Sequence, residues 1–166
     1  KGLNCGKGSR DNKININKNL NFVAKKMEVK KNKLILMHQT HSNKVIEIKK
    51  NNFKKRINAD AMITKMNGFA IGVLTADCVP IIVYDVRNRI IGCIHAGWKG
   101  AFLGIIDNTI KKLKKLNTNS NIYASVGPCI GEKSYEVDNL FYKKFVSKSR
   151  RNKIYFKNKN KTKKLF

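Results

Sequence analysis

The 166-residue sequence has few acidic residues, few cysteines and no long hydrophobic run. A membrane-spanning helix needs about 20 mostly apolar residues in succession, and no stretch of this sequence approaches that length. The stretch from Lys1 to Lys7 leads into a polar stretch, whereas the start of a secretory signal peptide leads into an apolar one. We therefore expect neither a membrane span nor a signal peptide, and no membrane partner.

Cysteine is too scarce for a disulfide-stabilised fold. Cys5, Cys78, Cys93 and Cys129 are scattered over a chain that is long enough to bury a hydrophobic core. Disulfide-rich domains are shorter and carry their cysteines more densely. We therefore predict a reduced, cytoplasmic protein. Cys93, inside an apolar run, and Cys129, beside Pro128, are predicted to be small buried residues.

Acidic residues are strongly outnumbered: 10 Asp and Glu against 36 Lys and Arg give a formal net charge of +26. Such a charge predicts salt-sensitive adhesion to nucleic acids. The lysines form no single stripe, however, and are interleaved with asparagine, as a coding bias towards A and T would produce. Aromatic residues, 8% of the chain, are not interleaved with the basic runs as a base-stacking surface requires. We therefore do not expect a nucleic-acid partner, and a basic nucleic-acid-binding domain is the non-enzyme alternative.

The apolar pattern predicts an α+β domain. Hydrophobic residues make up 42% of the chain, enough for a folded core. Residues 1–17 are expected to be irregular. An apolar stripe with lysines on the opposite side predicts a helix over Trp98–Leu116, and further helices are predicted over Asn19–Lys30 and Tyr135–Val146.

Short apolar runs separated by turn-like pairs predict a mostly antiparallel sheet. The second run is expected to be the hairpin partner or the continuation of the first. The predicted strands cover Leu34–Met37, Val45–Ile48, Ala61–Thr64, Phe69–Thr75, Val79–Asp85, Arg89–Ile94, Asn121–Val126 and Ile154–Phe156.

An Asp-Cys pair, Asp77-Cys78, interrupts the apolar pattern, and a later apolar run leads into His95. Polar groups inserted between buried strands are costly unless they have partners. His95 and the upstream His41 are candidate partners, because two imidazoles and one thiolate suit zinc and are acceptable for copper. Such a set leaves a fourth position open for water or substrate. We therefore predict a metal site formed by His41, Cys78 and His95.

Each of these residues also has a structural explanation. The three are far apart in the sequence and lack the short spacing of common zinc motifs. A histidine that follows a strand often only forms hydrogen bonds within its loop, and Cys78 also suits a small buried position. Asp77 is expected either to orient a ligand or accept a proton, or to form hydrogen bonds with the adjacent turn.

The stretch Gly97-Trp98-Lys99-Gly100 follows His95 at the predicted start of a helix. Unpaired backbone N–H groups at a helix start can bind an anion, and Lys99 adds a positive charge there. We therefore predict a phosphate or oxyanion site at these four residues. The alternative is that the two glycines only allow the helix to approach the sheet closely.

Five short motifs occur together between Gly2 and Val137. They are Gln39-Thr40-His41-Ser42, Asp60-Ala61, Ala76-Asp77-Cys78-Val79-Pro80, His95-Ala96-Gly97-Trp98-Lys99-Gly100, and Gly127-Pro128-Cys129-Ile130-Gly131 with Tyr135-Glu136-Val137. In this order they resemble the YfiH-like family, also called the laccase-domain or polyphenol oxidase family. The motif at residues 76–80 and the motif at residues 95–100 are together specific for this family.

The resemblance implies a four-layer α/β/β/α sandwich with mixed, mostly antiparallel sheets. It also implies a surface metal site, with zinc or alternatively copper, whose ligands correspond to His41, Cys78 and His95. Family members are described as purine nucleoside phosphorylases, so purine nucleoside and phosphate are the implied substrates. The implied reactions are phosphorolysis of adenosine, inosine and methylthioadenosine to the base and ribose 1-phosphate, and deamination of adenosine. The catalytic group then comprises the three ligands and Asp77, and Gln39 is a candidate contact for the base or ribose.

The sequence departs from the family pattern at both ends. An early Arg-Gly-Gly segment and a late arginine-bearing segment, both natural phosphate contacts, are not found. We therefore expect residues 1–166 to form a single YfiH-like domain that lacks segments at both ends. Older family labels leave two enzyme alternatives, a copper-dependent polyphenol oxidase and a peptidoglycan-editing hydrolase with Cys78 as nucleophile. The three histidines of the chain are too few for a multicopper cluster.

Overall fold

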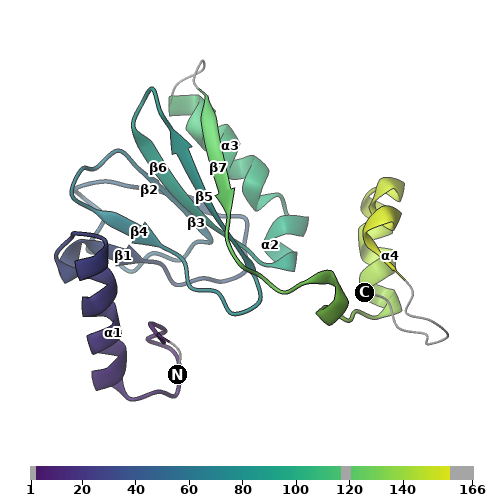
Figure 1. Ribbon diagram of the computed structural model, residues 1–166. Helices are drawn as coiled ribbons and strands as arrows, with labels where there is room; N and C mark the ends of the chain where they lie inside the picture. Colours follow the sequence, from purple (N-terminus) through teal and green to yellow (C-terminus); the bar gives the residue numbers. More distant parts are fainter. Residues whose placement is uncertain (1–2, 117–120, 158–166) are drawn as a thin grey trace. The chain divides into compact units, whose positions relative to one another are not determined.

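A computed structural model describes residues 3–116 and 121–157 (Figure 1). The chain divides into two compact units, Lys1–Pro128 and Cys129–Phe166. The first unit contains all strands of the described residues, and the second contains a helix and two 3₁₀ turns. Within the described ranges, no helix combines the length and the hydropathy that a membrane span requires.

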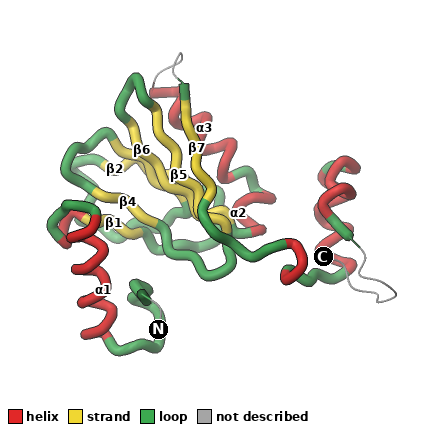
Figure 2. The backbone as a smooth tube through the Cα atoms, in the orientation of Figure 1, coloured by secondary structure: helices red, strands yellow, loops and turns green. Residues whose placement is uncertain are grey.

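A five-stranded mixed sheet with the order β2-β3-β6-β5-β7 forms the centre of the first unit (Figures 1 and 2). The pairs β3–β6, β5–β6 and β5–β7 are antiparallel, whereas β2 runs parallel to β3. The strands cover Val45–Ile48 (β2), Ala61–Thr64 (β3), Val79–Asp85 (β5), Ile90–Ala96 (β6) and Ile122–Val126 (β7).

Two further strands, Leu34–Leu36 (β1) and Ala70–Gly72 (β4), pair in parallel as a second small sheet. The prediction that Val45–Ile48 extends or pairs with the first strand is therefore wrong. The reason is that the connection between β1 and β2 bonds to the segment before β3 instead of closing a hairpin. The His38 N–H donates to the Ile57 carbonyl, and the Asp60 N–H donates to the Lys44 carbonyl.

Hydrophobic clusters pack on both faces of the five-stranded sheet, although on one face only over part of it. On one face, Ile105 and Leu113 of helix α3 (Ile105–Leu116) pack against Ile63 and Ile94. On the other face, a second cluster comprises Ile35, Met37, Ile48, Ile57, Ala59, Met62 and Cys93. Helix α1 (Lys13–Lys26) lies beside the β1–β4 pair, so the layers follow the α/β/β/α order that the resemblance implied (Figure 1). Cys93 is 4% exposed, which confirms its prediction as a buried residue.

The β5–β7 side of the sheet carries exposed apolar side chains on the face opposite α3. Ile82 and Tyr123 are 61% and 63% exposed, although β5 is an interior strand. Tyr84 lies directly opposite Tyr123 in the register and is also exposed. The second cluster reaches β2, β3 and β6, so among the described residues it covers only that part of the face.

Glycine divides the long helix predicted over Trp98–Leu116. The structure has two helices here, Trp98–Phe102 (α2) and Ile105–Leu116 (α3). Gly104, between them, has a φ of +83°, a left-handed conformation that ends helices and that glycine adopts without strain.

Side-chain caps move the other predicted helix boundaries. Asn12 accepts a hydrogen bond from the Ile14 N–H, so α1 begins at Lys13 within the stretch expected to be irregular. Asp138 accepts from the Phe141 N–H, so α4 covers Asn139–Lys148 instead of Tyr135–Val146.

The second unit differs from the predictions in two more respects. The strand predicted over Ile154–Phe156 is wrong, because Arg150–Tyr155 forms a 3₁₀ helix that follows α4 directly. Cys129 is exposed, so its prediction as a small buried residue is also wrong. The residues that surround Cys129 form no strand or core cluster that would bury it among the described residues.

Candidate metal centre

Three elements of the first unit bring His41, Cys78 and His95 together. His95 is the penultimate residue of β6, and Cys78 directly precedes β5, whose Pro80 pairs with His95 in the sheet register. His41 lies in the connection between β1 and β2. One ligand atom from each of the three residues lies within 4.8 Å of the other two. The structure thus juxtaposes the three residues predicted as a metal site.

The three side chains differ in their exposure to solvent. The Cys78 Sγ lies 3.8 Å from His41 Nε2, and the two imidazole rings meet edge to face with centroids 4.8 Å apart. His95 is only 3% exposed, Cys78 is half-buried and His41 is exposed. A ligand would therefore reach this cluster from the solvent side, where His41 and Cys78 lie.

The donor set fits zinc. Ligand atoms bound to one zinc ion at 2.0–2.3 Å lie about 3–4 Å from each other. The observed distance of 3.8 Å between Cys78 Sγ and His41 Nε2 is of this size, and the outer limit of 4.8 Å requires only a small side-chain movement. Two imidazoles and a thiolate also leave a fourth tetrahedral position open.

Gly97 separates the cluster from helix α2. A Cβ atom at this position would lie 2.7 Å from His41 Cδ2 and 3.0 Å from Cys78 Sγ. At Gly100, a Cβ atom would lie 2.9 Å from the Ser42 carbonyl oxygen. A side chain would thus collide at both glycines, with the cluster at Gly97 and with the connection between β1 and β2 at Gly100. Trp98 and Lys99, between the two glycines, are exposed, and phosphate binding there stays a prediction.

Asp60 is a residue of the site that the sequence argument did not assign. It is fully buried, and its carboxylate accepts hydrogen bonds from the backbone N–H groups of Thr40, His41 and Ser42. The hydroxyls of Thr40 and Ser42 and the Nδ1 of His95 bond to it as well, the last at 2.8 Å. The sequence feature that could have indicated this residue is the position of Asp60 in the Asp60-Ala61 motif, directly before the apolar residues 61–63.

The pKa of Asp60 and that of the Cys78 thiol are shifted in opposite directions. Burial raises the pKa of Asp60, but hydrogen bonds from His95, Ser42 and Thr40 outweigh it and hold the pKa at about 2. Burial raises the pKa of the Cys78 thiol, and the negative charges of Asp77 and Asp60 raise it further. In the absence of a cation, Asp60 is thus charged near neutral pH and the Cys78 thiol is more strongly protonated than an ordinary cysteine.

Gln39 and Asp77, the remaining predicted site residues, have different surroundings. The Gln39 side-chain amide donates to the Leu74 carbonyl and accepts from the Leu74 N–H, both at 2.7 Å. It thereby joins the segment that carries His41 to the one that carries Cys78. Asp77 is exposed, next to Cys78.

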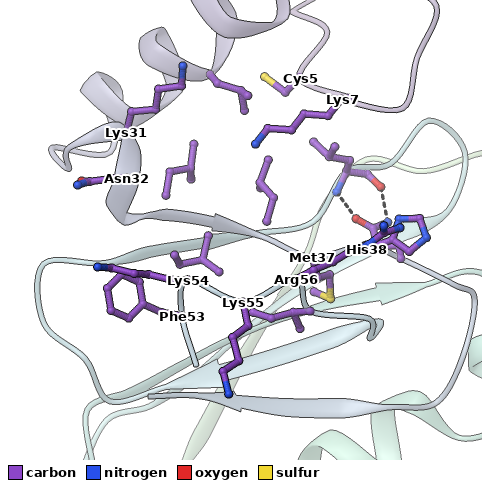
Figure 3. A pocket seen from close by; sticks show the side chains of 18 of the residues that line it. Cys5, Lys7, Lys31, Asn32, Met37, His38, Phe53, Lys54, Lys55 and Arg56 are labelled. Atoms are coloured by element: carbon purple, nitrogen blue, oxygen red, sulfur yellow. Dashed lines mark hydrogen bonds between the residues drawn. The ribbon is translucent and has the colours of Figure 1, made fainter. Parts of the chain in front are cut away.

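A cavity of about 1330 Å³ lies beside these segments, between α1 and β1 (Figure 3). Aliphatic residues such as Ile35 and Met37 line it, and its charged lining residues are basic, for example Lys7 and Arg56. Gln39 lines the cavity, but the three clustered residues do not. The cluster of His41, Cys78 and His95 is therefore open to solvent on one side and does not line this cavity.

Curated relatives of the chain are named purine nucleoside phosphorylases. The one from Rickettsia conorii is 36% identical over 123 residues, which cover 74% of this chain and 50% of that protein. The one from Aquifex aeolicus is 38% identical over 128 residues, which cover 76% of this chain and 60% of that protein. The chain thus spans about half the length of the curated relatives it matches.

Solved structures and a family model place the chain among known folds. The chain resembles the hypothetical protein YfiH of Bacillus licheniformis, with a TM-score of 0.87 and 24% identity over 98% of this chain and 65% of that one. A protein of Neisseria meningitidis matches with a TM-score of 0.84 and 25% identity, over 98% of this chain and 64% of that one. The family model described as multi-copper polyphenol oxidoreductase laccase matches residues 1–166. The chain therefore belongs to this laccase-like, YfiH-type family.

Proposed function

We propose that this chain provides the metal centre of a purine nucleoside phosphorylase. The observation that carries the proposal is the cluster of His41, Cys78 and His95 in a chain whose curated relatives bear that name. The reaction would convert a purine nucleoside and phosphate into the free base and ribose 1-phosphate. Adenosine, inosine and methylthioadenosine are the proposed nucleosides, and deamination of adenosine is a proposed second reaction.

Zinc is the proposed metal, held by His41 Nε2, Cys78 Sγ and an imidazole nitrogen of His95. When bound, it would supply Lewis acidity at a position open to substrate. The chain's own contribution is to hold two nitrogens and one sulfur close together, on strand β6, on the connection between β1 and β2, and on the bend before β5. Since a thiol ligand must stay reduced, we also propose a cytoplasmic location.

The exposed groups around the cluster suit the binding of substrate. Lys99 carries a positive charge at the start of α2, next to Gly97 and the cluster, where it would attract phosphate. Gly97, Trp98 and Gly100 complete the proposed phosphate contact. In phosphorolysis, a phosphate oxygen bonds to the anomeric carbon while the bond from that carbon to the purine breaks. Asp77 is exposed beside Cys78 and is the proposed proton acceptor in deamination, where a water proton must be removed.

The metal-ligand role of Cys78 is favoured over that of a hydrolase nucleophile. A nucleophilic cysteine is activated by a lowered pKa, usually next to a cation. Here burial and the nearby Asp77 and Asp60 charges raise the pKa of the Cys78 thiol. A metal ion is the natural means of deprotonating such a thiol. A multicopper oxidase is disfavoured because the chain has three histidines.

The proposal is tested by measuring purine release from adenosine and from inosine, with and without phosphate, while bound metal is quantified on the same sample. We expect phosphate-dependent release in proportion to bound zinc. The variant His41→Ala should lose both metal and turnover. His38→Ala is the matched control, because His38 is an exposed histidine of the same connection outside the cluster. Phosphate-independent release, or equal losses in both variants, would overturn the proposal.

A further inference from the structure

Asp60 connects two of the three proposed metal ligands to each other. We propose that it is a positioning residue that prepares His41 and His95 for one metal ion before the metal arrives. It would fix the tautomer of His95 through the side chain and the position of His41 through the backbone. This inference rests on the proposed metal centre, and its test below separates the two.

The contact with His95 determines which imidazole nitrogen is available. His95 Nδ1 lies 2.8 Å from Asp60 Oδ1, and the His95 backbone N–H donates to the Asp60 carbonyl at 2.7 Å. A charged carboxylate only accepts hydrogen bonds, so the proton of the neutral imidazole belongs on Nδ1. The lone pair is then on Nε2, as in the carboxylate–histidine–metal arrangements of known metal sites.

The contact with His41 acts on the backbone. His41 has a φ of +55°, a left-handed conformation that is unfavourable for residues other than glycine and needs support from its surroundings. The His41 N–H donates to Asp60 Oδ1 at 3.0 Å, and the Ser42 N–H and hydroxyl donate to Oδ2. The same buried carboxylate thus holds the turn that directs His41 towards Cys78 and His95.

Of the two buried aspartates, Asp60 and Asp85, Asp60 is the one whose carboxylate bonds to both His41 and His95. Asp85 is likewise buried, but it accepts hydrogen bonds from the backbone N–H and side-chain amide of Asn88, in the turn between β5 and β6. A purely structural role for Asp60 would resemble that of Asp85, with an effect on folding alone. A positioning role predicts in addition a change at the imidazoles and in metal affinity.

The variants Asp60→Asn and Asp85→Asn make the matched comparison. In Asp60→Asn, an amide NH₂ replaces one acceptor oxygen and opposes the N–H donors of residues 40–42. We expect zinc affinity, measured by chelator competition, to fall about 10- to 100-fold in Asp60→Asn and to stay within twofold in Asp85→Asn. ¹⁵N NMR of the histidine side chains in the metal-free proteins should show a single Nδ1–H tautomer for His95 in the native protein and a mixture in Asp60→Asn.

Three results would overturn the inference: an Nε2–H tautomer of His95 in the metal-free native protein, unchanged zinc affinity in Asp60→Asn, or equal losses in the two variants. If Asp60→Asn does not fold, Ser42→Ala removes the hydroxyl that donates to Asp60 and accepts from the Lys44 N–H, and it leaves the backbone N–H contacts of Asp60 in place. It should weaken zinc binding by about 2- to 10-fold without moving the His95 tautomer, and unchanged binding would contradict the role at His41. A native protein that binds no zinc would instead overturn the proposed metal centre, while the tautomer measurement would still test Asp60.

Discussion

The cluster of His41, Cys78 and His95 has a buried half and an exposed half that differ in their surroundings. His95 lies within strand β6, is 3% exposed and bonds to the fully buried Asp60. Cys78 lies in a bend before β5, and Asp77 beside it is exposed. The buried half is ordered by hydrogen bonds and packing alone. In the exposed half, the Cys78 Sγ lies 3.8 Å from His41 Nε2, and the proposed cation would replace the thiol proton.

Because of this difference, substitutions in the two halves should affect the free energy of unfolding and the metal affinity differently. Changes in the buried half should affect both the free energy of unfolding and metal affinity, because the same hydrogen bonds serve both. Changes in the exposed half should affect metal affinity while leaving the metal-free fold intact, because few packing contacts are lost there.

The largest effect is expected for Cys78→Ala, which removes a ligand from the exposed half. Zinc affinity should fall more than about 100-fold, beyond the range typical of residues that only support a ligand. The unfolding free energy of the metal-free protein should change by less than about 1 kcal/mol. Chelator competition and denaturant unfolding measure the two quantities. Cys129→Ala, at an exposed cysteine outside the cluster, is the control, and an equal loss there would contradict the account.

A somewhat smaller effect is expected for Gly97→Ala. The new Cβ would lie 2.7 Å from His41 Cδ2 and 3.0 Å from Cys78 Sγ, so both ligands must move apart. We expect zinc affinity to fall about 10- to 100-fold, as for residues that orient ligands. The same chelator competition applies to Gly131→Ala, where a Cβ meets no atom within 4 Å. A loss in Gly131→Ala as large as that in Gly97→Ala would show that the effect is not local.

Acid should act on the buried half. The pKa of Asp60 is about 2 in the folded protein against an ordinary value of 3.8, because hydrogen bonds from His95, Ser42 and Thr40 outweigh the effect of burial. The carboxylate therefore contributes stability, about 2 kcal/mol, that is complete above about pH 4 and is lost as the pH falls to about 2. The unfolding free energies of the native protein and Asp60→Asn should converge over this range. A difference that does not change with pH would contradict the assignment.

The pH dependence of metal binding should report on the exposed half. The raised pKa of the Cys78 thiol means that a metal ion displaces a proton at neutral pH. Zinc affinity should therefore fall about tenfold for each unit that the pH decreases below that pKa, from the thiol alone. Titration in weak buffer should detect the released proton. Binding without proton release at neutral pH would indicate that the thiol is not a ligand.

The sequence predicted the three clustered residues better than the buried carboxylate of Asp60, which bonds to two of them. Cys78 and His95 were recognisable because polar residues interrupt or end apolar runs, and these runs are indeed strands β5 and β6. Asp60 was not recognisable as a positioning residue, because its partners depend on how residues 38–44 lie against residues 57–61. This contact is formed by hydrogen bonds between segments that are distant in the sequence, and no local pattern encodes it.

The fold shows the same limit. The positions of β1 to β7 and the α+β class followed from apolar periodicity, whereas the pairing of β2 with β3 did not, and the strand predicted over Ile154–Phe156 is a 3₁₀ helix up to Tyr155. Helix α3 was evident from its apolar stripe, but the break before it depends on the positive φ of Gly104. A glycine within a helical pattern is compatible with continuation or termination, and tertiary packing decides between the two.

X-ray absorption spectroscopy at the zinc edge, on protein loaded with one equivalent of zinc, shows whether Cys78 Sγ is a ligand. We expect one sulfur at about 2.3 Å and two imidazole nitrogens at about 2.0–2.1 Å, with the sulfur absent in Cys78→Ala. A first shell without sulfur in the native protein, or one that is the same in Cys78→Ala, would contradict this expectation.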